Sequence, residues 1–113
     1  GLQVYQGSLP PLDVPSGLRA QATAGGRVVL SWDPVDEAAG YQLYRSGPQP
    51  SSEWEPVGDR IPVATRIDVP PVEGEYLYTV ASLRIVGLAE AESAPSEPVS
   101  AVSDATPPSA PTG

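Results

Sequence analysis

The sequence contains no cysteine and no histidine. Without cysteine the chain forms no disulfide and offers neither a thiol nucleophile nor a thiolate metal ligand. Without histidine it lacks the most common general base of enzymes and the most common metal ligand of proteins. These absences argue against an enzyme, and we expect neither catalytic residues nor a cofactor.

Lysine and methionine are absent as well, and the net charge of −8 comes from six basic residues, all arginine, against 14 acidic ones. An acidic surface repels phosphate backbones and anionic lipid head groups, so we expect no nucleic-acid partner and no membrane insertion. No apolar run approaches the roughly 20 residues that a membrane-spanning helix needs. No signal peptide is visible, and the chain starts at Gly1 and contains no methionine, so we interpret it as a segment of a longer protein.

Proline and glycine are abundant, with 15 and 11 residues in a chain of 113. This content predicts many turns and no long helix. Hydrophobic residues make up 40% of the chain, which suffices for one small core. A composition rich in alanine, glycine, proline and arginine without lysine fits a bacterial source with a GC-rich genome.

The clearest strand pattern is Gly74–Ser82, which we expect to extend to Ile85. Its residues Tyr76, Tyr78 and Val80 fall on one face at a period of two. Glycine and a proline pair precede the strand, which predicts a sharp corner before it. A tyrosine in this position buries its ring while its hydroxyl bonds a backbone group of the corner.

Further short segments have the same alternation or lie between turn residues: Leu18–Thr23, Arg27–Asp33, Tyr41–Ser46, Glu53–Val57, Ala64–Asp68 and residues 99–103. Gly25-Gly26 indicates a hairpin turn, and Pro56 indicates an edge strand. Val86–Glu92 is interpreted as a loop, as is the helix-like string Leu88–Ala94. About seven short strands at this spacing predict an all-β antiparallel sandwich.

The order and spacing of several motifs resemble those of a fibronectin type III domain. The motifs are PSGLRA at Pro15–Ala20, VVLSWDP at Val28–Pro34, GYQLYR at Gly40–Arg45, TRID at Thr65–Asp68, GEYLYTVAS at Gly74–Ser82 and SAPSEPVSA at Ser93–Ala101. The resemblance implies a seven-stranded, immunoglobulin-like β-sandwich. Gly87–Ser93 is longer than the loop usual at that position in the family.

The resemblance also assigns a core between the sheets. The expected core residues are Trp32, Tyr41, Leu43, Ile67, Tyr76, Tyr78 and Val80. Among them, Trp32 takes the position of the core tryptophan of the second strand, and Tyr76 that of the corner tyrosine.

The domain is expected to cover residues 14–103, after an N-terminal extension or linker at 1–13 and before a proline-rich linker at 104–113. Residues 11–17 resemble residues 107–113, and the matched Pro15 and Pro111 stand 96 positions apart, about one domain. We interpret this as a tandem array joined by extended linkers. The alternative is that such linkers resemble one another by chance.

Two groups of residues are candidate sites. The first is acidic, and its members are Asp33, Asp36, Glu37, Glu90 and Glu92, from two loops expected at the same end of the sandwich. These are weak metal candidates, because calcium needs several converging oxygens and the spacing is not that of a known calcium loop. We expect a solvated acidic surface there instead.

The second group is the aromatic pair Tyr44 and Trp54, a candidate binding surface for sugar rings or a protein partner. The alternative is that Trp54 packs over the edge of the sheet.

Together these observations predict a non-catalytic structural or spacer and protein-interaction module of a multidomain secreted or cell-envelope protein. Its expected partners are neighbouring domains of the same chain and another protein or a polysaccharide. One alternative function is an accessory domain of a secreted carbohydrate-active enzyme. Another is a calcium-dependent adhesion repeat.

Overall fold

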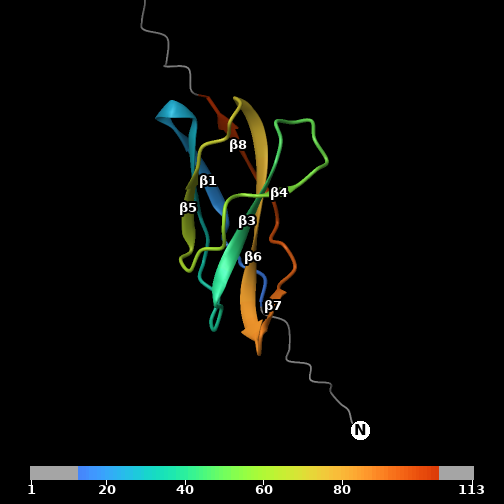
Figure 1. The fold of residues 1–113 in the computed structure, drawn as a ribbon. Coiled ribbons are helices and arrows are strands. Elements are labelled where there is room, and N and C mark those ends of the chain that lie inside the picture. The colour runs from blue at the N-terminus through green and yellow to red at the C-terminus, as the bar shows by residue number, and fades with distance from the viewer. Residues whose placement is uncertain (1–12, 105–113) are drawn as a thin grey trace, which may run out of the picture.

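The computed structural model describes residues 13–104, which form two antiparallel β-sheets packed face to face (Figure 1). The smaller sheet has the order β1 (Arg19–Thr23), β2 (Arg27–Ser31), β5 (Thr65–Asp68). The larger sheet has the order β4 (Glu55–Pro56), β3 (Gly40–Ser46), β6 (Gly74–Val86), β7 (Ala89–Glu92), and β8 (Val99–Ser103) also pairs with β6. The predicted all-β sandwich is confirmed, with eight strands in place of seven. No helix among residues 13–104 is long and apolar enough to cross a membrane.

The turn between β1 and β2 lies where the glycine pair predicted it. Ala24–Gly26 forms a single 3-10 turn, and Gly25 and Gly26 both have positive φ angles, of 82° and 76°. Such angles favour glycine because it has no Cβ atom. The connection is therefore one residue longer than the expected two-residue hairpin.

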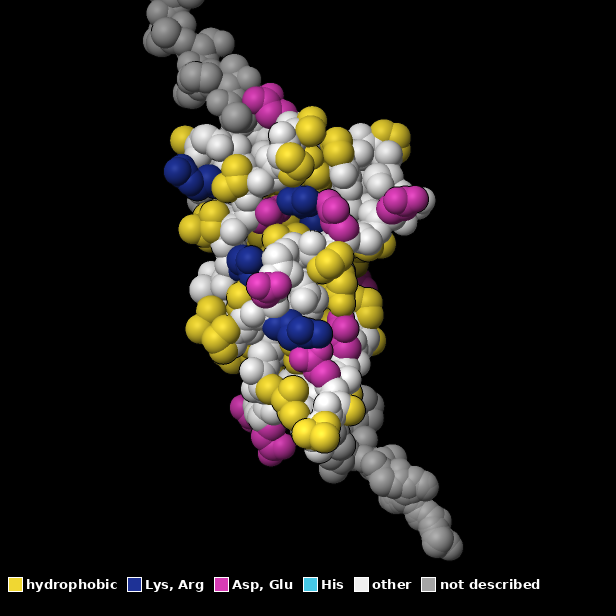
Figure 2. Space-filling model, in the orientation of Figure 1, with side chains coloured by type: hydrophobic (Ala, Val, Ile, Leu, Met, Phe, Trp, Pro, Cys, Tyr) yellow, Lys and Arg dark blue, Asp and Glu magenta, His cyan; other side chains and the backbone are white. Residues whose placement is uncertain are grey.

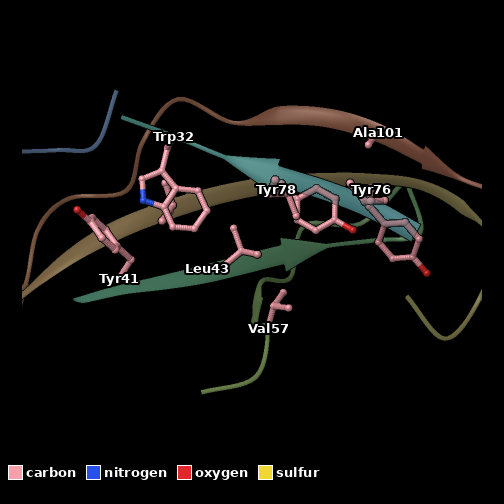
Figure 3. Packing of buried hydrophobic residues seen from close by; sticks show 10 residues of the cluster. Trp32, Tyr41, Leu43, Val57, Tyr76, Tyr78 and Ala101 are labelled. Carbon is pink, nitrogen blue, oxygen red and sulfur yellow. The ribbon is translucent and has the colours of Figure 1, made fainter. Parts of the chain in front are cut away.

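The core is formed by large side chains that face one another between the sheets (Figure 3). Val28, Leu30, Trp32, Tyr41, Leu43, Tyr76, Tyr78 and Val80 are all buried there. The rings of Trp32 and Tyr41 meet edge to face with centroids 5.5 Å apart and an interplanar angle of 69°, an arrangement that aromatic pairs prefer. Six of the seven residues expected in the core are thus buried.

The seventh expected core residue, Ile67, is 58% exposed, so that assignment was wrong. Ile67 pairs with Val29, whereas the neighbouring Asp68 pairs with the fully buried Val28. Because side chains alternate across a strand, Asp68 faces the interior and Ile67 faces outward. The strand buries its carboxylate and exposes its isoleucine, which is the reverse of the usual preference.

The expected loop at Val86–Glu92 was also wrong, because most of it forms β7. The strand pairs with the end of β6, from Leu83 opposite Glu92 to Val86 opposite Ala89. The turn contains Gly87, whose φ is 62°. The sequence of β7, AEAE, has low intrinsic strand preference, and its pairing with a long neighbouring strand overrides that preference.

The predicted tyrosine corner is present. The ring of Tyr76 is buried, and its hydroxyl donates a hydrogen bond to the carbonyl oxygen of Val72 at 2.5 Å. This bond fastens the proline-containing corner to the start of β6.

The two ends of the described chain leave the sandwich at opposite poles (Figure 1). We call the end that holds Asp13 and the β6–β7 turn the N-terminal pole. The end that holds Asp104 and the segment between β5 and β6 is the C-terminal pole. The expected linker residues 1–12 and 105–113 lie outside the described residues, so the predicted domain bounds stay a prediction.

The incoming chain at the N-terminal pole is fastened to both sheets. The Ser82 hydroxyl on β6 donates to the Asp13 carbonyl oxygen at 2.8 Å. The backbone N–H of Asp33, just beyond β2, donates to the Ser16 carbonyl oxygen at 2.8 Å. The direction of the chain at Asp13 is therefore set by the sandwich itself.

Candidate binding groove

An open groove of about 380 Å³ lies on the outer face of the larger sheet. Its lining residues are Tyr44, Trp54, Thr79, Glu92, Pro95, Ser96 and Pro98. Tyr44 follows the buried Leu43 on β3 and therefore points away from the core. Trp54 lies just before β4 and is 43% exposed. The structure thus brings together the two aromatic residues that the sequence suggested as a binding surface.

The segment Ser93–Pro98 forms one side of the groove and replaces regular strand pairing with side-chain bonds. The Ser96 N–H donates to the Val80 carbonyl at 2.9 Å, and the Val80 N–H donates back to the Ser96 hydroxyl at 3.0 Å. Ser93 makes the same exchange with Ser82, at 2.9 and 3.0 Å. At Val80 and Ser82 of β6, a serine hydroxyl therefore accepts the hydrogen bond that a carbonyl oxygen of a neighbouring strand would otherwise accept.

This arrangement holds two prolines in the groove. Pro95 and Pro98 have no N–H to contribute to a ladder, and the serine bonds fix the chain around them. The Thr79 hydroxyl adds a bond to the Ser96 carbonyl oxygen at 2.6 Å. The hydroxyls at the base of the groove are thus already engaged in hydrogen bonds within the fold.

The polar end of the groove is a hydrogen bond from the Tyr44 hydroxyl to the Glu92 carboxylate. Burial, the hydrogen bond to Glu92 and the negative charge of Glu92 together raise the pKa of Tyr44 to about 12, and burial makes the largest contribution. The neighbouring Glu90 is paired with Arg60, 2.5 Å away. Tyr44 therefore stays a neutral hydrogen-bond donor in the physiological pH range.

The five acidic residues considered as metal candidates do not form one site. Within residues 13–104, no three acidic side chains come together as a metal ion requires. Asp33 instead faces Arg19 at 3.6 Å, while Glu90 and Glu92 are engaged by Arg60 and Tyr44. Asp36 and Glu37 lie exposed in the loop before β3.

A second polar cluster lies inside the sandwich. Arg45 of β3 donates from Nη1 to both carboxylate oxygens of Asp68 of β5, at 3.0 and 2.9 Å, and from Nη2 to Glu55 at 2.8 Å. The Tyr78 hydroxyl donates to the same Asp68 at 2.7 Å. Burial raises the pKa of Tyr78, and the bond to Asp68 raises it further. Burial alone would lower the pKa of Arg45, but its carboxylate partners raise it overall.

This inner cluster joins the two sheets, and its charged groups are paired with one another. We therefore assign the cluster a structural role. The sequence reasoning missed it, together with Pro95, Ser96 and Pro98. For the groove, a usable pattern was present in SAPSEP, where serines three positions apart are each followed by a proline two residues later. For the cluster, the usable pattern was the position of Arg45 two residues after Leu43. This spacing places both side chains on the inward face of β3.

The sequence matches no family model and no curated protein. Among solved structures, the fibronectin type III domain of human fibronectin type III domain containing protein 3 is 18% identical with a TM-score of 0.66, covering 94% of this chain and 100% of that one. The fn3 domain of human collagen alpha-1(XX) chain is 26% identical with a TM-score of 0.62, covering 94% and 98%. A beta-1,2-glucanase from Parabacteroides distasonis is 27% identical with a TM-score of 0.62 over 85% of this chain.

Two antiparallel sheets with a buried tryptophan and a corner tyrosine define an immunoglobulin-like sandwich. Within that class, the fold is that of a fibronectin type III domain, and the resemblance seen in the sequence is confirmed. The chain spans only 14% of the length of the glucanase.

Proposed function

We propose that this chain is a non-catalytic spacer and interaction module of a multidomain secreted or cell-envelope protein. The observation that carries the spacer role is the exit of the two ends at opposite poles, with the incoming end fastened by Ser82 (Figure 1). A module built this way sets a fixed distance between whatever lies before and after it. Its fold is one shared by structural and interaction modules.

The spacer role is tested by small-angle scattering from a chain of two copies joined end to end. We expect an elongated particle with a maximum dimension about twice that of a single copy, because a proline-rich connection is extended. Two modules folded side by side into a compact particle would contradict the spacer role.

The interaction role is assigned to the groove, and the partner class that we propose is a protein. Trp54 and Tyr44 are large side chains with few rotatable bonds, and the serine-fixed segment holds the wall opposite them in place. Preformed aromatic sites of this kind supply most of the binding energy at protein interfaces. The net charge of −8 disfavours polyanions as partners.

A neutral polysaccharide is the second candidate partner, because the faces of Trp54 and Tyr44 suit sugar rings. The similarity of this module to a stretch of a glucanase also favours it. Retention on immobilised neutral glucans, lost in Trp54→Ala and kept in Val102→Ala, would establish this candidate. Val102 is exposed on β8 and does not line the groove, so it controls for a general loss of surface area. No retention on any glucan would leave the protein partner as the proposal.

A further inference from the structure

Both poles of the module carry exposed hydrophobic side chains. At the N-terminal pole, Leu88 in the β6–β7 turn is completely exposed and Ile85 is 56% exposed. At the C-terminal pole, Val69 and Val72, between β5 and β6, are each 57% exposed. Figure 2 shows hydrophobic side chains gathered at both ends of the face in view. Apolar side chains exposed at the points where a chain enters and leaves are available for contact with a neighbouring module.

The fastened N-terminus determines which neighbour reaches the β6–β7 turn. Ser82 holds Asp13 on the strand that continues into this turn. A copy of the module that precedes Asp13 therefore lies next to the pole where Leu88 projects. The C-terminal pole of that preceding copy faces Leu88.

Charge repulsion at this pole is reduced by local pairing. Asp33 faces Arg19 and Glu90 pairs with Arg60, so two of the acidic side chains near the turn have cationic partners. Asp36 and Glu37, in the loop before β3 at the same pole, lie exposed. In a molecule with a net charge of −8, the apolar β6–β7 turn is therefore better able than that loop to meet a second acidic copy.

From these observations we infer that Ile85 and Leu88 of one module seat against Val69 and Val72 of a preceding copy of the same module. This inference rests on the proposed spacer function, and the copy as partner is supported by the resemblance between residues 11–17 and 107–113. The contact is head to tail, with different patches on the two sides, so it extends a row of modules without closing it. A small contact is enough, because the linker holds the two poles at an effective concentration of about millimolar.

The first test compares the thermal midpoint of one copy with that of the downstream copy in a two-copy chain. We expect attachment of the upstream copy to raise the midpoint by about 5 °C. Leu88→Ser or Ile85→Ser in the downstream copy removes the increase, as does Val72→Ser in the upstream copy. The matched control is Ile67→Ser, since Ile67 has nearly the same exposure as Ile85 but lies on the side of the smaller sheet.

The second test uses the absence of cysteine from the sequence, which makes an introduced cysteine a unique labelling site. A polarity-sensitive dye on Leu88→Cys should shift its emission to shorter wavelength when the upstream copy is attached, and Val72→Ser upstream should abolish the shift. The same dye on Ile67→Cys should show no shift.

The outcomes separate this inference from the function on which it rests. An elongated two-copy particle in which the dye at position 88 stays in water, and in which the midpoint is unchanged, overturns the head-to-tail contact and leaves the spacer role standing. A compact side-by-side particle overturns both.

Discussion

The two ends of the core are stabilised in different ways. Toward the N-terminal pole, Trp32 packs edge to face on Tyr41. Stability there depends on large apolar side chains filling the space between the sheets. Toward the C-terminal pole, Asp68 accepts hydrogen bonds from Arg45 and Tyr78. Stability there depends on every one of these hydrogen-bonding partners being present. A buried apolar group that is lost leaves a cavity, whereas a lost member of the polar cluster leaves a buried charge without its partner.

The largest effect is expected at the apolar end. Trp32→Ala removes the largest buried side chain and should lower the free energy of unfolding by about 3–5 kcal/mol, since the neighbouring sheets relax only partly into the space. Chemical denaturation monitored by circular dichroism measures this change. An unchanged midpoint would show that Trp32 does not hold the two sheets together.

At the polar end, Asp68→Asn should cost about 2–3 kcal/mol, because it removes a charged acceptor shared by Arg45 and Tyr78. Arg45 keeps Glu55 as a partner, which places the effect below that of Trp32→Ala. The same denaturation experiment measures it.

The comparison is sharpened by replacing the whole cluster, with Arg45→Met, Asp68→Leu and Tyr78→Phe in one chain. This variant should be more stable than Asp68→Asn alone, because no charge is left buried without a partner. If the triple variant loses more stability than the single one, the cluster contributes net stability, and the contrast between the two ends is wrong.

A smaller effect is expected where the partners are neutral. Ser96→Ala leaves the Val80 N–H without its acceptor and should cost about 1–2 kcal/mol. Hydrogen exchange of the Val80 amide should become faster in the variant. Ser100→Ala, at an exposed position of β8, is the control and should change neither quantity.

The smallest effect on stability is expected from the titration of Tyr44. Its pKa of about 12 in the folded state lies above the ordinary value of 10, so folding favours the protonated hydroxyl. The resulting stabilisation is complete below pH 10 and is lost as the pH rises from 10 to 12. Tyrosinate absorbance in a pH titration of the wild type and of Tyr44→Phe identifies the group. Glu92→Gln should lower the pKa of Tyr44, and an unchanged value would contradict the role of Glu92.

The sequence predicted the features that follow from local alternation. Trp32 and Tyr76 were placed correctly because each lies in a strand pattern with clear parity or beside a clear turn. Ile67 was misplaced because its apolar character was weighed above its register, and the register depends on the pairing of Asp68 with Val28. The strand β7 was missed because its alanines and glutamates have little strand preference without β6 beside them.

Only the aromatic side of the groove was predicted from the sequence. The outward direction of Tyr44 follows from its neighbours on β3, and Trp54 was noted as its companion. Its opposite wall depends on Ser96 bonding to Val80, sixteen residues away, and no pattern within a single strand reveals such a bond. The pairing of Arg45 with Asp68 is likewise between residues distant in sequence.

In the array of linked copies that we propose, the proline-bearing segment beside β6 has a further consequence. Linked copies meet at high local concentration, where an open sheet border invites a foreign strand to pair with it and begin aggregation. Pro95 and Pro98 present no N–H along that border, and the serine hydroxyls have already satisfied the strand behind them. The feature that shapes the groove therefore also protects a crowded chain against cross-molecular strand addition.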